Sequence, residues 1–115
     1  MNSVNLTARL TRAPELVETK GDTAVCNLRV AIERRSDGAV FTDVKTFGAQ
    51  AAACAEYLSK GDPVAVIGRL ELDEWQVNGA KRSRLYVIGE RVEFLGRRSD
   101  SSAEQSPAEE VEAAA

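Results

Sequence analysis

Aromatic rings and basic side chains are the groups in this sequence whose types and positions could do chemistry. Bases of a single-stranded nucleic acid stack on such rings at about 1–3 kcal/mol each, while flexible cations neutralise its phosphates. Phe41 and Phe47 alternate with Lys45 on one strand face, and Trp75 precedes a basic run. The predicted contact set has three aromatic and seven basic members: Trp75, Phe47, Phe41, Arg34, Arg35, Lys45, Arg69, Lys81, Arg82 and Arg84.

The competing interpretation of these residues is structural. An aromatic residue at strand spacing is more often part of a core, so Phe41 and Phe47 taken alone fit buried positions, and Phe94 is predicted to be buried. Trp75 follows two acidic residues near a glycine turn, where full burial is hard to arrange. We therefore expect Trp75 on the surface, near the start of a long hairpin loop. A short basic run such as Arg34-Arg35 can also be a solvated turn.

Catalytic chemistry has little support in the sequence. The chain contains no histidine, which removes the usual nucleophile–histidine schemes and histidine-bearing zinc sites. Its two cysteines, Cys26 and Cys54, favour two buried thiols, with a disulfide as the alternative. Asp73 and Glu74 are adjacent on an expected strand, so their carboxylates point to opposite faces and do not converge. We expect neither an enzyme nor a bound cofactor or metal.

The charge of the chain is unevenly distributed. All 15 basic side chains precede Ser99, together with 13 acidic ones, so residues 1–98 carry a net charge of +2. Residues 99–115 carry five acidic side chains and no basic one, which gives −5. A polar, acidic segment without an aromatic residue cannot bury enough surface to offset its ordering entropy. The prediction is one domain over residues 1–98 and a disordered acidic tail over residues 99–115.

Hydrophobic periodicity predicts five strands and one helix. Alternating apolar residues mark strands over residues 4–10, 26–32, 40–47, 64–72 and 85–95, and a loop is expected over residues 11–22. Ala51, Cys54, Ala55 and Leu58 follow the spacing of a short amphipathic helix. Asn78-Gly79 marks the tip of a hairpin between the last two strands. This order predicts an all-β protein with one short helix, a five-stranded Greek-key barrel of the OB-fold type.

Four segments resemble the bacterial single-stranded DNA-binding protein family. The opening ten residues with Pro14-Glu15 resemble the first strand of that family, and Phe41–Gly48 resembles its aromatic third strand. Residues 55–64 resemble the end of its helix and its fourth-strand entry, and Gly68-Arg69-Leu70 followed by Trp75 resembles its Gly-x-Leu and tryptophan. The resemblance covers about residues 2–96.

This resemblance implies an OB-fold, a homotetramer, and single-stranded DNA bound without sequence preference and wrapped around the assembly. By position, Phe47 and Trp75 match the stacking aromatics of the family. Phe41 stands where the family often has another aromatic residue, commonly tryptophan.

This sequence departs from the family pattern at several aromatic and basic positions that would contact DNA. No aromatic residue stands near Arg35-Ser36, where the family has a further tryptophan, and Glu71–Glu74 is acidic where the family is often basic. Lys81, Arg82 and Arg84 are then expected to compensate. The chain ends in Glu and Ala residues without the acidic Pro-Phe tip that recruits replication enzymes. Recruitment through the tail is therefore not expected, and an accessory role fits this ending.

The sequence-based prediction is a non-catalytic protein that coats single-stranded DNA during replication, recombination or repair. Two alternatives remain: an OB-fold assembly factor that binds a replication protein, and an RNA-binding OB module. Since no apolar run has the length of a membrane span and no signal-like segment opens the chain, we expect a cytoplasmic, nucleoid-associated protein.

Overall fold

The computed structural model describes residues 1–18, 21 and 23–96. Six strands and one helix follow one another in the order β1 (Val4–Leu10), β2 (Glu15–Glu18), β3 (Ala24–Glu33), β4 (Ala39–Phe47), α1 (Gly48–Tyr57), β5 (Pro63–Val77) and β6 (Ala80–Phe94). No helix in this part of the chain is long and apolar enough to cross a membrane. The expected tail over residues 99–115 and its boundary at residue 98 lie outside the described residues.

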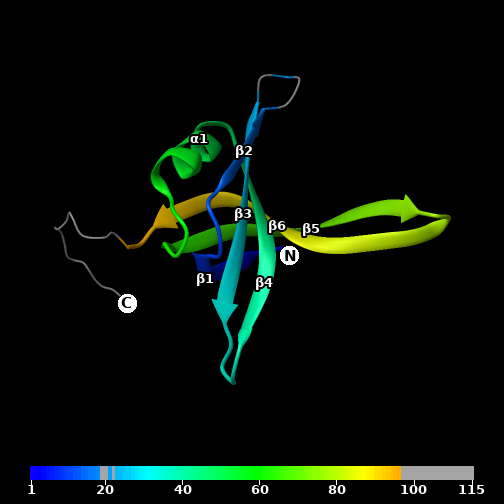
Figure 1. Cartoon of the computed structure of the whole chain (residues 1–115), viewed down its shortest axis with the longest axis horizontal. Coiled ribbons are helices and arrows are strands. Elements are labelled where there is room, and N and C mark those ends of the chain that lie inside the picture. The colour runs from blue at the N-terminus through cyan, green and yellow to red at the C-terminus, as the bar shows by residue number, and fades with distance from the viewer. Residues whose placement is uncertain (19–20, 22, 97–115) are drawn as a thin grey trace.

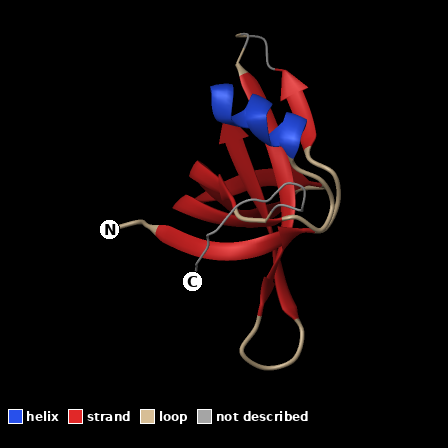
Figure 2. Cartoon of the chain, turned by 90° about the vertical axis from the view of Figure 1, so that its left-hand side faces the viewer, coloured by secondary structure: helices blue, strands red, loops and turns tan. Residues whose placement is uncertain are grey.

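Five of the strands close into a barrel. β1 pairs with β5, β5 with β6, β4 with β3, and β3 with the end of β1, all antiparallel. A short parallel pairing between β4 and β6 closes the ring, at Val44 opposite Val87 and Lys45 opposite Ile88. This arrangement confirms the predicted all-β barrel with one short helix. Figure 2 shows α1 lying across one end of the barrel, where it contacts β3 and β4.

Alternation along the strands places small apolar side chains inside the barrel. Cys26, Leu28 and Val30 of β3 are buried while Asn27 and Arg29 between them face outward, as strand geometry requires. Thr46 is buried as well, and its hydroxyl donates to the carbonyl of Cys26 at 3.2 Å. The core consists of residues from five strands, the helix and the position directly after it: Ala8, Leu10, Cys26, Leu28, Val30, Val44, Ala51, Cys54, Leu58, Val64, Val66 and Val87.

The cysteines are two buried free thiols, as the favoured interpretation expected. Cys26 and Cys54 are fully buried and form no disulfide. Burial raises the pKa of both thiols, and that of Cys54 reaches about 11. Both thiols are therefore protonated near neutral pH, which makes them poor nucleophiles.

The predicted element order is wrong in one place, and two predicted strands are too short. Residues 11–22 are not all loop, because Glu15–Glu18 forms β2, which extends the sheet beyond β3 and makes it six-stranded. β5 and β6 are 15 residues each and run to the Asn78-Gly79 turn, so Trp75 lies within a strand and not in a loop. The paired ends of these strands have no buried face, and so they lack the alternation that predicts a strand.

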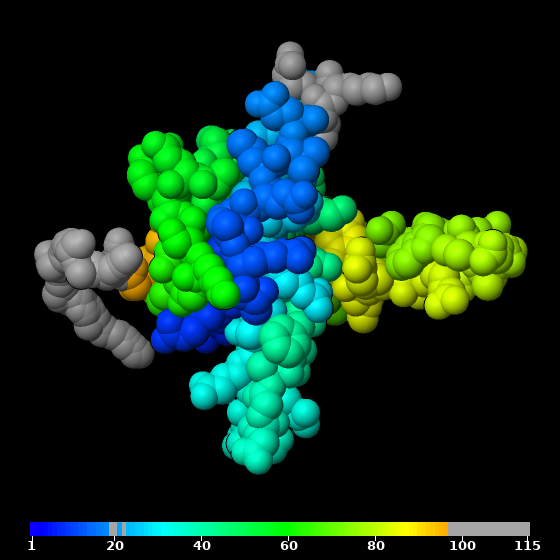
Figure 3. Space-filling view, in the orientation of Figure 1, coloured from blue at the N-terminus to red at the C-terminus, as the bar shows by residue number. Residues whose placement is uncertain are grey.

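Three hairpins project from the barrel. Figure 1 shows β2–β3, β3–β4 and β5–β6 extending in three different directions from a common centre. The space-filling view in Figure 3 shows the β5–β6 hairpin as a separate arm. These arms carry most of the predicted contact residues away from the core.

Candidate nucleic-acid interface

Trp75 lies on the projecting part of β5, opposite Arg82 of β6. Directly paired residues of an antiparallel hairpin share one face, so Trp75 and Arg82 lie side by side. Arg84 follows on the same face, and its guanidinium carbon is 5.8 Å from the centre of the Trp75 ring. The indole is 41% exposed, which confirms the surface position expected from the sequence.

β4 presents a second aromatic face. Phe41, Asp43, Lys45 and Phe47 alternate with the inward-facing residues Val44 and Thr46, as predicted. Phe41 is 56% exposed and Phe47 43% exposed, so neither ring belongs to the core. Phe94, which was predicted to be buried, is also exposed, because it lies at the last residue of β6 beyond the barrel interior. The exposure of Phe41 and Phe47 favours the binding interpretation over the structural one.

Arg34 and Arg35 lie in the turn of the β3–β4 hairpin, next to the end of β4 that carries Phe41. Arg69 lies on β5, opposite Ile88. Trp75, Arg82 and Arg84 therefore form one group on the β5–β6 arm. Phe41 with the two turn arginines forms a second group, at the opposite end of β4 from Phe47.

Several of the predicted cations already have acidic partners. Arg84 lies 3.7 Å from Asp43, Lys81 lies 3.9 Å from Glu74, and Arg69 pairs with Glu71 and Glu90. Within the described ranges, Arg34, Arg35 and Arg82 form no ion pair. Of the three residues expected to compensate for the acidic segment before Trp75, Lys81 thus pairs with Glu74 of that same segment.

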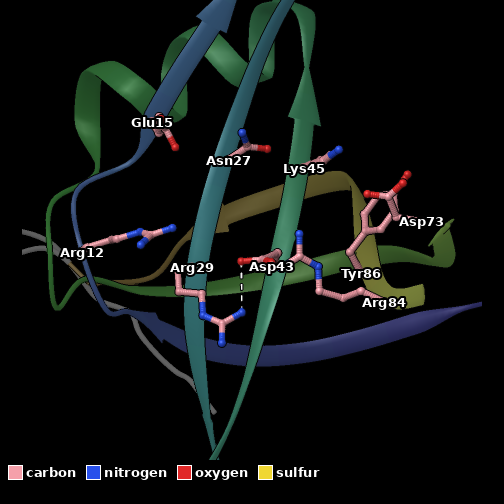
Figure 4. Close-up of a pocket in the computed structure, with 9 residues that line it drawn as sticks. All are labelled: Arg12, Glu15, Asn27, Arg29, Asp43, Lys45, Asp73, Arg84 and Tyr86. Atoms are coloured by element: carbon pink, nitrogen blue, oxygen red, sulfur yellow. Dashed lines mark hydrogen bonds and ion pairs between the residues drawn. The ribbon is translucent and has the colours of Figure 1, made fainter. Parts of the chain in front are cut away.

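A cavity of about 450 Å³ opens on the outer face of the barrel, where the β5–β6 hairpin leaves it. Figure 4 shows side chains from β3, β4 and β6 converging on this cavity, with Asn27 and Lys45 on neighbouring strands. Its lining comes mainly from Asn27, Arg29, Asp43, Lys45, Arg84 and Tyr86. Arg12, Glu15 and Asp73 complete it.

Of the nine lining residues, only Lys45 and Arg84 were among the predicted contacts, and Asn27, Arg29 and Tyr86 are among the seven that sequence reasoning missed. Asp43 accepts a hydrogen bond from Arg29 at 3.1 Å, and the ammonium of Lys45 lies 4.7 Å from the centre of the Tyr86 ring. Tyr86 lies on the same face of β6 as Arg82 and Arg84. The predicted strand began at residue 85, after both arginines, so this shared face was not visible in the sequence. Asn27 and Arg29 carried no sequence signal beyond their outward positions.

Comparison with known proteins adds independent information to this geometry. The model of the family described as "Single-strand binding protein family" matches residues 1–95. A "Single-stranded DNA-binding protein" of Treponema pallidum is 36% identical over 84% of this chain and 58% of its own length. The protein of that name from Clostridium tetani is 38% identical over 83% of this chain and 70% of its own length. "Single-stranded DNA-binding protein 2" of Clostridium acetobutylicum is 36% identical, with 90% of this chain and 84% of its own length covered.

Proposed function

The chain belongs to the single-strand binding protein family, and on that basis we propose that it binds single-stranded DNA without sequence preference, as a non-catalytic protein. The observation that supports this most is the β5–β6 arm, where exposed Trp75 lies beside Arg82 and Arg84. A ring next to cations offers stacking to a base and neutralisation to its phosphate, and neither depends on base identity.

The other predicted contacts extend this interface over β4. Phe47, Lys45 and Phe41 follow one another along the outer face of that strand, with Arg34 and Arg35 beyond Phe41. The two phenylalanines are six positions apart on this strand, which corresponds to about 20 Å at roughly 3.3 Å per residue. We propose that the single-stranded DNA passes between the β5–β6 arm and this face of β4. Arg69 and Lys81 would contact its phosphates at the edges of the interface.

The cellular context is also part of the proposal. Protection of single-stranded DNA during replication, recombination or repair, in the cytoplasm and at the nucleoid, fits a protein that binds such strands. We also propose a homotetramer, as the family resemblance implies.

The single tryptophan makes the binding test direct. Titration with oligo-dT should quench the fluorescence of Trp75, and added salt should reverse the quenching. In an anisotropy titration with labelled oligo-dT, Trp75→Ala should weaken binding by about 1–3 kcal/mol, or roughly 5- to 140-fold. Trp75→Phe, which keeps a ring, should lose less.

The outcomes separate the candidate functions. Absence of oligo-dT binding by the wild type would contradict the proposed function and favour an assembly factor. Binding of Trp75→Ala with wild-type affinity would move the stacking contacts to Phe41 and Phe47. Equal competition by oligo-dT and oligo-rU would extend the ligand class to RNA.

A further inference from the structure

Tyr86 is an aromatic residue on the binding face that the stacking set above leaves out. It lies on the same face of β6 as Arg84 and Arg82, because alternate strand residues share a face. Tyr86 is four residues from Arg82, the partner of Trp75, which corresponds to about 13 Å along the strand. A nucleic-acid strand that leaves Trp75 along the arm toward the barrel therefore reaches the Tyr86 ring.

The surroundings of Tyr86 form a cavity and not a flat surface. Tyr86 is half-buried in the lining of the 450 Å³ cavity, and Lys45 lies over its ring. This volume lies within the range of roughly 300–1,000 Å³ that is typical of small-molecule sites. One nucleotide fits such a cavity, whereas a duplex does not.

Asn27 lines the same cavity, and its side chain carries an acceptor without a partner among the described residues. Its side-chain oxygen Oδ1 is buried and has no hydrogen-bond partner in the described part of the chain. Buried polar atoms nearly always have a partner, so an unsatisfied one needs an explanation. Asn27 pairs with Lys45 across β3 and β4, so the two residues lie side by side on the outer face of these strands.

Two guanidinium groups bring positive charge to the cavity. Arg29 and Arg84 both line it, and both pair with Asp43, at 3.1 Å and 3.7 Å. A guanidinium has five N–H donors, so one shared carboxylate leaves donors free on each arginine. These donors can bind a phosphate next to a base held in the cavity.

We propose that this cavity is a second base-binding subsite, in which one base stacks on Tyr86, donates from its edge to Asn27, and has its phosphate bound by Arg84. Every base carries an N–H donor on its pairing edge, so a single acceptor accommodates all four. A base arriving on the covered ring face displaces the ammonium of Lys45, which then pairs with phosphate. The proposal rests on the proposed function, to which it adds a subsite.

Substitution of the ring tests the stacking contact. Tyr86→Leu should weaken oligo-dT binding about 5- to 140-fold in the anisotropy titration, while Tyr86→Phe should bind nearly as the wild type does. Tyr57→Leu is the matched control, because Tyr57 is exposed at the end of α1 and lies outside the cavity. Its affinity should not change.

Substitution of Asn27 tests whether its side-chain oxygen accepts a hydrogen bond from the base. The expected result is a loss of affinity without a loss of thermal stability, which a structural role would not produce. Asn27→Leu removes a buried acceptor without a partner, so the Tm should stay the same or rise. Oligo-dT affinity should nevertheless fall, by about 2- to 12-fold for one neutral hydrogen bond. If Asn27 contacts the ligand, the substitution lowers the affinity without lowering the Tm. If Asn27 has a structural role, the substitution lowers both.

Two results would overturn the subsite while leaving the proposed function in place. The first is wild-type affinity of Tyr86→Leu alongside weakened binding of Trp75→Ala. The second is a parallel loss of affinity and Tm in both Tyr86 variants, which would make the residue structural. Failure of the wild type itself to bind oligo-dT would contradict the proposed function instead.

Discussion

Arg84 is the residue through which the two parts of the interface meet. It comes from β6, lies 5.8 Å from the centre of the Trp75 ring on β5, and reaches 3.7 Å from the carboxylate of Asp43 on β4. Asp43 also holds Arg29 at 3.1 Å. A phosphate at this point therefore competes with an internal carboxylate for both arginines.

Replacement of Asp43 by asparagine should release this competition. In Asp43→Asn, both arginines lose their ion pair and are available to phosphate. We expect oligo-dT affinity at low salt to rise about 3- to 10-fold and the salt slope to steepen by up to about 1. Anisotropy titrations over a salt series measure both quantities.

Glu93→Gln is the control for Asp43→Asn. Glu93 also forms an ion pair, with Arg91 at 3.0 Å, but neither residue belongs to the predicted interface. The control should leave affinity and salt slope unchanged. Identical behaviour of both variants would show that Asp43 does not restrain binding.

At the residue scale, the sequence predicted which side chains face outward better than it predicted which side chains contact one another. The shared face of Phe41, Lys45 and Phe47 follows from strand alternation alone, and the structure confirms it. The contact between Arg84 and Asp43 joins strands far apart in the chain, so no local pattern indicates it. The same holds for Lys45 over Tyr86, which depends on the parallel pairing of β4 and β6.

The β5–β6 hairpin is the element that positions Trp75, and its turn controls its geometry. Asn78 has a φ of 51° and Gly79 a φ of 81°, the pair of positive values typical of a two-residue type I′ turn. The sequence predicted this turn from Asn-Gly but ended both strands too early. Backbone pairing, rather than a buried face, holds the outer part of the arm.

Backbone strain introduced in this turn should lower the affinity for oligo-dT more than it lowers the thermal stability of the protein. Gly79→Val places a β-branched residue in the left-handed region, at a cost of about 1–3 kcal/mol, which frays the arm. We expect oligo-dT affinity to fall about 3- to 30-fold with a small change in Tm, because the arm lies outside the core. The emission spectrum of Trp75 should shift with the change in its surroundings.

Gly61→Val is the matched control for strain. Gly61 has a φ of 91° in the turn before β5, and it is not part of the arm. This variant should lower the Tm and leave the affinity of the folded protein intact. Equal losses of affinity in both variants would contradict a specific role for the arm.

At the scale of the whole molecule, charge is the property that most affects binding. Residues 1–98 carry only +2, and residues 99–115 carry −5. We propose that the acidic segment competes with phosphate for the cations of the interface. The competition should fade with salt, because the screening length falls to about 10 Å at 0.1 M.

Removal of residues 99–115 should tighten oligo-dT binding at low salt, by about 2- to 10-fold, and have little effect at high salt. A variant that keeps residues 99–115 but has its five acidic residues changed to Asn or Gln distinguishes the effect of the charge from the effect of the length of this segment. It should bind as tightly as the truncated chain. Unchanged affinity in both variants would contradict competition by the acidic segment.

The parallel pairing of β4 with β6 also has a consequence for folding kinetics. It joins Val44 to Val87, residues far apart in the chain, through a short register, whereas the neighbouring pairings are mostly hairpins. Contacts of this kind form late, because a long stretch of chain must be ordered first. Lys45 and Tyr86 lie on the two strands of this seam. A nucleotide held between them would bridge β4 and β6, so we expect its binding to lengthen the lifetime of the closed barrel.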